Sequence, residues 1–328
     1  MVVTLTTFFI YALFSIFFIP LPSKKHPIVF YSNQTRFCLK NIFIHAIKTA
    51  QQQLTIHTFA LTDSGTLQQL IKKSQQGIHL EIVSDYRNLP AVYPFFEQEL
   101  NWSGIRTSGL MHQKVLLVDD TLSFLGTANM TYESMKMHDN LVLGFYSREL
   151  NTFLQEYTKK IPLRRSKKNS DHAFFSISGQ DLELWMLPFK GNKPLGRLLE
   201  LIRSAKTSID ISMFTLTHPT LLTALKEASQ QGVEINLYID KTSAQGASFK
   251  ALQSLEGSSI HLHLSQGIQL LHHKMMVIDN THFILGSANW TKSAFEKNHD
   301  FYLVLSPLTK PQLDRMQSVF KAIKKESQ

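Results

Sequence analysis

The sequence predicts an α/β protein of two lobes related by an internal duplication and a pseudo-twofold axis. Two repeated segments lead to this prediction. Residues 59–85 (FALTDSGTLQQLIKKSQQGIHLEIVSD) match residues 214–240 (FTLTHPTLLTALKEASQQGVEINLYID) without a gap. Residues 112–129 (HQKVLLVDDTLSFLGTAN) match residues 272–289 (HHKMMVIDNTHFILGSAN) in the same way. Because a repeated segment specifies a repeated structural unit, each half should carry the same architecture.

The hydrophobic pattern of each half predicts a helix, a strand, a second helix that ends at a glycine, and a second strand. These elements are expected at 42–51, 54–59, a helix closed by Gly77, and 78–83, and again at 198–205, 209–214, a helix closed by Gly232, and 233–239. A strand–helix–strand unit of this length favours parallel pairing. Each lobe is therefore expected to hold a mixed or mostly parallel sheet flanked by helices.

The expected boundaries follow from the repeat and from the charges. Residues 26–160 form the first lobe, 161–182 a linker, and 183–328 the second lobe. The stretch KKIPLRRSKKNSD at residues 159–171 is rich in lysine and arginine. A solvated linker is the favoured interpretation, and contact with anionic lipid or nucleic acid is the alternative.

The N-terminal segment, residues 1–25, differs in kind from the rest. Residues 2–20 carry no charge, and Lys24 and Lys25 follow them. The run approaches the roughly 20 residues that an apolar helix needs to cross a bilayer. We expect an N-terminal apolar helix that serves as a membrane anchor or as a signal segment, which makes the protein membrane-associated or secreted.

Composition narrows the partners and excludes cysteine chemistry. The chain has 328 residues, of which 43% are hydrophobic, and a formal net charge of +9. A basic balance favours anionic partners, namely phospholipids, a membrane surface or nucleic acid, without choosing among them. The single cysteine, Cys38, excludes an intramolecular disulfide and a cysteine-based metal cluster.

The second repeat carries the polar residues expected to do chemistry. Both copies fit the pattern H-x-K-x4-D-x6-G-[ST]-x-N, with His112, Lys114 and Asn129 in one and His272, Lys274 and Asn289 in the other. In a strand, residues i and i+2 share a face, so the histidine and the lysine of each copy point the same way. An imidazole beside an ammonium group suits a phosphate, and the asparagines can donate to phosphate oxygens.

Brought together across the pseudo-twofold axis, the two copies would place two histidines on opposite sides of one phosphorus. One neutral histidine can attack phosphorus while the other, protonated, donates to the leaving oxygen. Water activated by the second histidine then opens the phosphohistidine. With two lysines fixed in the site, neither a metal nor a cofactor is required. A zinc site built from the other histidines lacks ligand spacing.

Each catalytic histidine needs an acceptor that orients its ring. Asp139 and Asp300, which directly precede or lie next to an apolar strand, are predicted to fill this role. Asp119 and Asp279 belong to the repeat but are expected to fix the strand end rather than touch substrate. Thr127 and Ser287 are expected to support the site through their hydroxyl groups.

These motifs resemble the twin HKD signature of the phospholipase D superfamily, and the resemblance spans most of residues 28–320. It implies a two-lobed fold with the active site between the lobes, a phosphohistidine intermediate and no need for metal. It also implies that His112 is the nucleophile and His272 the acid. Thr127 departs from the serine usual in the motif and keeps the hydroxyl group.

The resemblance fixes the reaction and leaves the substrate open. A phospholipase D-type phosphodiesterase acting on phospholipid head groups at a membrane is the first expectation. A metal-independent nuclease is the second, and a phosphatidyltransferase of the cardiolipin synthase type is the third. A non-catalytic lipid-binding scaffold is disfavoured because every motif residue is present. An internal duplication removes the need to dimerise, so a monomer is expected.

Overall fold

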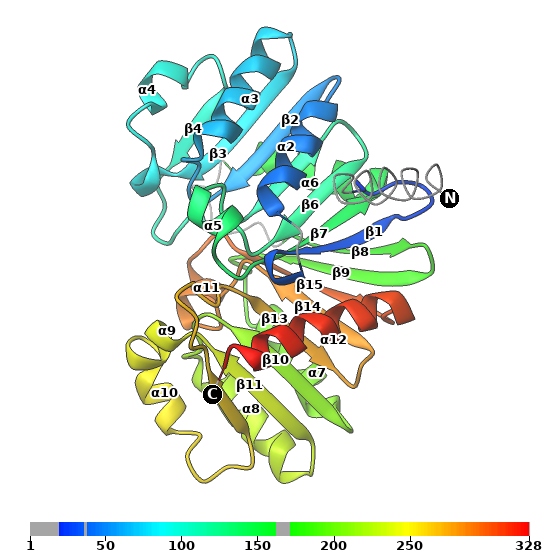
Figure 1. The fold of residues 1–328 in the computed structure, drawn as a ribbon, viewed down its shortest axis with the longest axis vertical. Coiled ribbons are helices and arrows are strands. Elements are labelled where there is room, and N and C mark those ends of the chain that lie inside the picture. Colours follow the sequence, from blue (N-terminus) through cyan, green and yellow to red (C-terminus); the bar gives the residue numbers. More distant parts are fainter. Residues whose placement is uncertain (1–19, 36–37, 162–170, 328) are drawn as a thin grey trace, which may run out of the picture.

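The computed structural model describes residues 20–35, 38–161 and 171–327, which form two lobes stacked on each other (Figure 1). The predicted N-terminal apolar helix falls mainly on residues 1–19 and lies outside the described residues. Within the described ranges, no helix combines the length and apolar character that a membrane span requires.

The first lobe is built on a seven-stranded sheet in the order β1-β7-β6-β5-β2-β3-β4. Its strands are β1 (Ile28–Ser32), β2 (Gln53–Thr58), β3 (His79–Asp85), β4 (Trp102–Ile105), β5 (Val115–Val118), β6 (Leu122–Gly126) and β7 (Leu141–Tyr146). The pairs β2–β3 and β3–β4 are parallel, and all other pairs are antiparallel. The sheet is mixed, as predicted, with the parallel pairs confined to the strand–helix–strand part.

The second lobe repeats this order with one extra strand, as β12-β11-β10-β13-β14-β15-β9-β8. Its strands are β8 (Asp171–Ile177), β9 (Gln180–Met186), β10 (Ser208–Met213), β11 (Glu234–Ile239), β12 (His261–Leu264), β13 (Lys274–Ile278), β14 (His282–Gly286) and β15 (Phe301–Ser306). Strand β9 pairs with β15 as β1 pairs with β7. Residues 171–182, expected to belong to the linker, instead form β8 and the start of β9.

The long helices are α2 (Leu39–Thr49), α3 (Ser64–Gln75), α6 (Arg148–Lys160), α7 (Lys193–Ser204), α8 (Pro219–Gln230) and α12 (Lys310–Lys325). The four predicted helices form as α2, α3, α7 and α8, and the two further long helices, α6 and α12, were not predicted. Asp63 caps α3 by accepting the amide of Thr66 at 2.8 Å. Gly77 and Gly232 follow α3 and α8 with φ of +81° and +89°, a left-handed conformation that favours glycine.

Shorter elements, which the sequence pattern did not predict, lie in the loops. They are the 3-10 turns η1 (Asn33–Thr35) and η2 (Tyr86–Asn88), and the helices α4 (Tyr93–Phe96), α5 (Tyr132–Lys136), α9 (Lys241–Gln245), α10 (Phe249–Gln253) and α11 (Lys292–Glu296). In Figure 1, helices α4, α5, α9, α10 and α11 all lie along the left side of the molecule.

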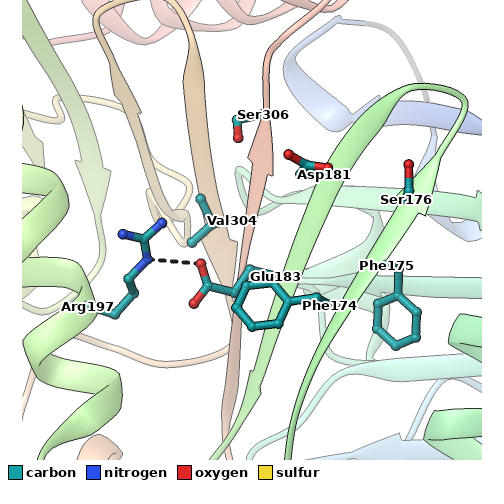
Figure 2. Close-up of a pocket in the computed structure, with 8 residues that line it drawn as sticks. All are labelled: Phe174, Phe175, Ser176, Asp181, Glu183, Arg197, Val304 and Ser306. Carbon is teal, nitrogen blue, oxygen red and sulfur yellow. Dashed lines mark hydrogen bonds and ion pairs between the residues drawn. The ribbon is translucent and has the colours of Figure 1, made fainter.

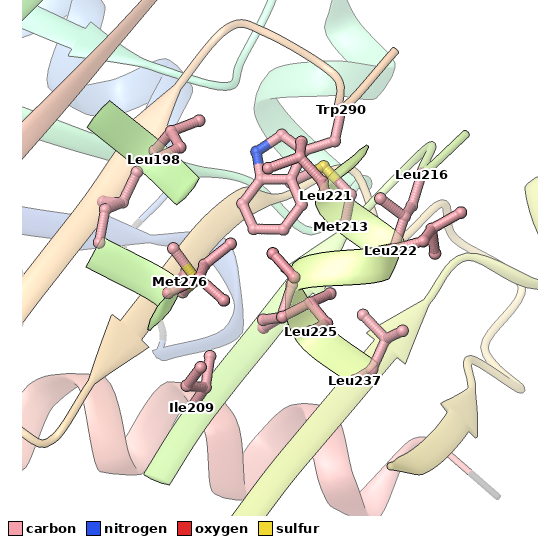
Figure 3. Close-up of a cluster of buried hydrophobic side chains, with 14 of the residues drawn as sticks. Leu198, Ile209, Met213, Leu216, Leu221, Leu222, Leu225, Leu237, Met276 and Trp290 are labelled. Atoms are coloured by element: carbon pink, nitrogen blue, oxygen red, sulfur yellow. The ribbon is translucent and has the colours of Figure 1, made fainter. Parts of the chain in front are cut away.

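Three apolar cores hold these layers together. One lies between the first sheet and α2 and α3, and a second lies between the second sheet and α7 and α8 (Figure 3). The third lies between the two sheets and includes apolar residues of α6 and α12. Phe30 and Phe283 meet there across the lobes, with ring centroids 5.3 Å apart. The shared core makes the two lobes one packed unit and fixes their mutual orientation.

Candidate active site

His112 and His272 lie at the edge of each sheet where the parallel strands end. Strand β5 runs antiparallel to β2, so the segment that begins β5 lies beside the end of β2, and β13 and β10 repeat this arrangement. The two histidines are nearly buried, with 7% and 8% of their surfaces exposed. The H-x-K segments of both lobes therefore reach the same side of the molecule, which in Figure 1 is the side of α5 and α11.

Backbone pairing between the lobes fixes both histidines at the seam. The amide of His112 donates to the carbonyl of His299 at 2.8 Å, and the amide of His272 donates to the carbonyl of Asp139 at 3.0 Å. Each motif histidine is thus held against the segment that precedes the last strand of the opposite lobe. The structure therefore brings His112 and His272 to one seam between the lobes.

An acid from the second lobe orients His112. The Nδ1 atom of His112 donates to Asp300 Oδ1 at 2.8 Å, and Asp300 is completely buried. The hydroxyl of Ser287 donates to the same carboxylate oxygen at 2.7 Å and accepts the amide of Phe301 at 3.0 Å. Burial opposes ionisation of Asp300, but the nearby His112 and Lys114 hold its pKa below the ordinary value. Asp300 is therefore a carboxylate that can balance positive charge on His112.

A neutral amide from the first lobe orients His272. The Nδ1 atom of His272 donates to Asn140 Oδ1 at 3.0 Å. The amide nitrogen of Asn140 donates to the carbonyl of Ser134 at 2.8 Å, which turns the amide oxygen toward the imidazole. The hydroxyl of Thr127 donates to that oxygen at 2.7 Å, as Ser287 does in the other half. In both histidines Nδ1 is engaged, so Nε2 is the nitrogen that can reach a substrate.

The predicted role of Asp139 is wrong, because the residue equivalent to Asp300 is Asn140. The two motif copies are offset by 160 residues throughout, from His112 and His272 onward. That offset pairs Asp300 with Asn140 and pairs Asp139 with His299. Asp139 contributes its backbone carbonyl to His272, and burial together with Glu326 and Asp240 raises the pKa of its side chain to about 7.

Lys114 and Lys274 are buried beside the histidines of their own halves. Lys274 Nζ donates to the carbonyl of His272 at 2.8 Å, and Lys114 Nζ donates to the carbonyl of His112 in the same way. Burial lowers the pKa of Lys114 to about 7, although Asp300 opposes the change. Burial and the charge of Lys114 also lower the pKa of Lys274 well below its ordinary value. The protonated form of each lysine is poorly solvated, and a bound anion would stabilise it.

The same electrostatics act on the two imidazoles. Burial and the charge of Lys114 lower the pKa of His112, and Asp300 only partly offsets them. Burial, Lys274 and Lys114 lower the pKa of His272 well below the ordinary value, without a carboxylate in contact with its ring. Positive charges on these two lysines and two histidines would repel one another at the seam, and the charge of a bound anion would relieve this repulsion.

Asn129 and Asn289 lie at the ends of the turns after β6 and β14, where the motif places them. Both are half-buried. Among the described residues, the side-chain oxygen of each is buried and has no hydrogen-bond partner. A buried amide oxygen without an internal partner costs free energy unless a donor satisfies it. These oxygens are therefore suited to accept a hydrogen bond from a group that enters the site.

Asp119 and Asp279 lie at the opposite end of the motif strands and have structural contacts. Asp119 accepts backbone amides from residues 51–53, and Asp279 accepts backbone amides from residues 206–208. These contacts join the turn before β2 or β10 to the end of β5 or β13. Neither aspartate reaches the histidines.

Two further aspartates, Asp85 and Asp240, position the segments before the motif histidines. Asp85 Oδ2 accepts the amide of Met111 at 2.8 Å, and Asp240 Oδ2 accepts the amide of Leu271 at 3.0 Å. Both aspartates are buried at the end of a parallel strand. Their presence at equivalent positions of the first repeat was the sequence signal, but the pattern gave no reason to connect them with the second repeat.

Phe59 and Phe214 complete the wall of the site and were also not predicted as site residues. The ring of Phe59 lies 5.3 Å from that of His112, and Lys114 Nζ lies 5.7 Å from its centroid. Phe214 lies 5.1 Å from both the ring of His272 and Lys274 Nζ. Each phenylalanine faces the lysine with its ring and limits water around the imidazole.

Two other buried histidines, His57 and His273, have structural partners. His57 Nε2 pairs with the hydroxyl of Thr158 at 2.8 Å, and His273 Nδ1 pairs with the hydroxyl of Ser212 at 3.2 Å. His138 places a third imidazole 6.3 Å from the ring of His272. In residues 20–35, 38–161 and 171–327, no group of three or more His, Cys, Asp or Glu side chains is arranged to hold a metal ion.

A cavity of about 320 Å³ lies away from the motif residues, beside the β8–β9 hairpin (Figure 2). Phe174 and Phe175 line one side, and Glu183 pairs with Arg197 on the other at 2.9 Å. Glu183 also accepts the indole N–H of Trp185 at 2.7 Å. None of the motif residues lines the cavity, so it does not carry the chemistry of the motifs.

Comparison with known proteins agrees with the arrangement of the two halves. The sequence matches the family described as "Cardiolipin synthase, PLD-like domain" over residues 43–161 and 198–324. Human mitochondrial cardiolipin hydrolase is 30% identical over 122 residues, which cover 35% of this chain and 45% of that protein. Cardiolipin synthase 1 of Staphylococcus epidermidis is 24% identical over 294 residues, which cover 75% of this chain and 58% of that protein. The chain thus spans roughly half the length of these curated relatives.

Solved structures share the fold. Phosphatidylserine synthase of Haemophilus influenzae has a TM-score of 0.72 at 13% identity, over 94% of this chain and 88% of that one. Polyphosphate kinase of Porphyromonas gingivalis has a TM-score of 0.62 at 12% identity, over 92% of this chain and 50% of that one. At such identities the likeness concerns the fold alone.

The family match covers one HKD motif in each half, and the structure brings the two motifs to one seam. The chain therefore belongs to the family of cardiolipin synthase PLD-like domains and, with it, to the phospholipase D superfamily of phosphodiesterases and phosphatidyltransferases.

Proposed function

We propose that this protein cleaves a phospholipid head-group phosphodiester through a phosphohistidine on His112 and passes the phosphatidyl group to water. One observation carries the proposal. His112 and His272 come from opposite halves, meet at one seam, and are each held through Nδ1 by a residue of the other half. Two opposed Nε2 atoms can act on the two sides of one phosphorus atom.

In the first step, Nε2 of neutral His112 forms a bond to phosphorus, and the bond from phosphorus to the head-group oxygen breaks. The departing oxygen keeps the electron pair and takes a proton from Nε2 of His272. The phosphorylated ring of His112 carries a positive charge because its Nδ1 retains a proton. Asp300, at 2.8 Å from that nitrogen, balances the charge. The site has this carboxylate on the His112 side, which is the reason to assign His112 as the nucleophile.

In the second step, a water oxygen bonds to phosphorus and the phosphorus–nitrogen bond breaks, which restores neutral His112. His272, left neutral by the first step, accepts the proton of the water. Lys114 and Lys274 would bind the non-bridging oxygens throughout, and the amides of Asn129 and Asn289 would donate to the same oxygens. These groups are fixed before substrate arrives, so they stabilise the charge that develops in the transition state at little reorganisation cost.

Transfer of the phosphatidyl group to an alcohol is the second candidate. It uses the same intermediate and replaces water by a hydroxyl group. The similarity to the staphylococcal cardiolipin synthase favours it, because that similarity extends over 75% of this chain, whereas the similarity to the human cardiolipin hydrolase extends over 35%.

The test is an assay of the full chain in mild detergent on phosphatidylcholine, on phosphatidylglycerol, and on single- and double-stranded DNA. Each substrate is assayed with and without a chelator, and the lipids also with glycerol. Release of phosphatidic acid supports hydrolysis, and a new phosphodiester made from glycerol or from a second phosphatidylglycerol supports transfer. Cleavage of DNA with intact lipids would replace the proposal by a nuclease, and no turnover of any substrate would leave a binding scaffold. His112→Ala and His272→Ala serve as inactive controls, and near-native activity of either would refute the two-histidine mechanism.

A further inference from the structure

The side of the molecule that carries the active site is formed by loops and short helices, which we call the mouth face. It comprises residues 86–96, 106–110, 131–138, 241–250, 266–270 and 291–297. Four of these segments follow parallel strands, which end at one edge of each sheet. The other two, 131–138 and 291–297, connect β6 to β7 and β14 to β15. Figure 1 shows the helices of these segments, α4, α5, α9, α10 and α11, along one side of the molecule.

Exposed apolar side chains are concentrated on the mouth face. In the described part of the chain, nine large apolar side chains are exposed, and all but Phe174 and Leu262 belong to it. Ile268 is fully exposed, four residues before His272, and Phe95 of the first lobe is 79% exposed. Scattered exposed apolar residues are ordinary, but a concentration on one face marks a surface that binds another apolar surface.

The mouth face is also basic. Its segments contain seven lysines and arginines and two acidic residues, both glutamates. The whole chain contains 34 lysines and arginines and 25 aspartates and glutamates. Arg106 lies over the ring of exposed Tyr86, with its guanidinium carbon 4.3 Å from the centroid. In this pair the aromatic ring is largely apolar and the guanidinium group is charged. Such a pair suits the boundary between lipid head groups and acyl chains.

We propose that the mouth face docks on an anionic lipid bilayer and that Phe95 and Ile268, one from each lobe, enter between the head groups on either side of the active site. This inference rests on the proposed phospholipid substrate. Basic side chains at the rim would be attracted to anionic head groups, while the apolar side chains gain by leaving water. The docked enzyme would hold its two histidines over a lipid head group without extracting the lipid.

Two other occupants fit the same surface less well. Nucleic acid would use the basic residues and could stack on aromatic rings, but it offers nothing to the aliphatic side chains of Ile268 and Val92. A second copy of the chain would bring two basic faces together and would cover both active sites. An anionic bilayer matches the charge, the apolar character and the location beside the site at once.

The test places a reporter at single positions of the full chain. Cys38 is the only cysteine, and it occupies the N-cap position of α2, where serine is a favoured residue. In a Cys38→Ser background, Phe95→Cys, Ile268→Cys and Phe174→Cys are each labelled with an environment-sensitive fluorophore. Phe174 is the matched control, because it is 69% exposed but lies on the β8–β9 hairpin, outside the mouth face. The probes are vesicles of phosphatidylcholine with and without phosphatidylglycerol.

We expect labels at positions 95 and 268 to shift to shorter emission wavelength on phosphatidylglycerol vesicles, and the label at 174 to stay unchanged. A shift at 174 instead, or no shift at 95 and 268 on vesicles that bind the protein, would overturn the docking surface. Absence of vesicle binding would overturn it as well. A shift caused by single-stranded DNA but not by vesicles would assign the face to nucleic acid, and a concentration-dependent shift without vesicles would assign it to a second copy.

Activity provides a second readout. The double variant Phe95→Ser with Ile268→Ser should bind phosphatidylglycerol vesicles about tenfold more weakly per side chain removed, and its turnover of vesicle lipid should fall in step. Its turnover of a monomeric short-chain phospholipid should match that of the native protein. The control variant Phe174→Ser should match the native protein on both vesicle lipid and monomeric lipid. Equal loss on monomeric and vesicle lipid would contradict docking. Inactivity of the native protein on both lipids, with the labels still shifting, would refute the proposed function and leave the docking surface standing.

Discussion

His272 Nδ1 donates a hydrogen bond to the amide oxygen of Asn140 at 3.0 Å, at the position where the other half of the molecule pairs His112 with Asp300. Asn140 and Asp300 occupy equivalent positions in the two halves and have equivalent contacts. Each also accepts a hydrogen bond from a hydroxyl group in the turn after the second motif strand. They differ in charge. The site therefore gives one histidine a counter-ion and the other a neutral acceptor, and this asymmetry leads to the first two predictions.

Asn140→Asp should move the basic limb of the activity profile to higher pH. A carboxylate beside His272 raises the pKa of its imidazole, which burial and the lysines lower in the native protein. His272 donates a proton in the first step, so it is competent only below its pKa. Raising that pKa extends activity toward alkaline pH. The measurement is kcat against pH on a monomeric phosphodiester. An unchanged basic limb would show that another group donates the proton.

Asp300→Asn should lower kcat by about 10²-fold or more, the usual contribution of a group that assists proton transfer and charge balance. The change keeps the shape of the side chain but removes the charge that balances phosphorylated His112. Mass spectrometry after an alkaline quench, which preserves phosphorus–nitrogen bonds, should locate the phosphoryl group of the native enzyme on His112. Finding it on His272 would reverse the assignment of the two roles.

Gly286→Ala should destabilise the fold by about 1–3 kcal/mol or more, the usual cost of overpacking. A Cβ on Gly286 would overlap the backbone carbonyl oxygen of Phe301, because β15 passes close to the motif turn at this point. Gly196→Ala is the matched control. Its Cβ would meet no atom within 4 Å on the exposed side of α7, so this change should stabilise by about 0.5–1 kcal/mol. Urea unfolding measures both, and a similar midpoint for the two variants would contradict the packing argument.

Asp240→Ala and Asp279→Ala should separate positioning of the site from stability. Each removes a carboxylate that accepts backbone amides. The loss costs about 1–3 kcal/mol at Asp240, whose amide partners Ser243 and Leu271 are buried, and less at Asp279, whose amide partners are exposed or partly buried. Asp240 also holds the amide of Leu271, next to His272, so its loss should reduce kcat per folded molecule. Asp279 lies at the far end of β13, and its loss should leave kcat unchanged. Equal effects on kcat would exclude a positioning role for Asp240.

Much of this architecture was predictable because the duplication repeats its polar residues in register. The helix–strand order of residues 42–83 and 198–239 and the meeting of the two H-x-K segments follow from it. The orienting residue of His272 was missed because Asp139 was matched to Asp300 by residue type, whereas the constant offset of 160 pairs Asp300 with Asn140. Alignment of the two copies at this offset shows that an amide stands where the other half has an acid, whereas a search for acidic residues alone does not find it.

Other features had no clear signal in the sequence. The basic run that ends at Asp171 suggested a long linker, yet residues from Asp171 onward form the β8–β9 hairpin. Strand β9 of this hairpin also pairs with β15, which lies far along the chain. Helices α4, α9 and α10 lie between the two repeated segments, where the halves differ in length, so the repeat did not predict them. Asp85 and Asp240 were visible as a repeated pair, but their partners Met111 and Leu271 are contacts that only the folded chain makes.

The exchange of partners between the halves has a consequence for how such a site can evolve. If the halves were identical subunits of a dimer, any change at the orienting position would occur twice, and both histidines would receive the same neighbour. Joined in one polypeptide, the two copies can mutate independently while still depending on each other, since each supplies the group that the other half's imidazole needs. Asn140 and Asp300 are a difference that a homodimer of identical subunits cannot have, and through it one chain can specialise a donor and a nucleophile at equivalent positions of its two halves.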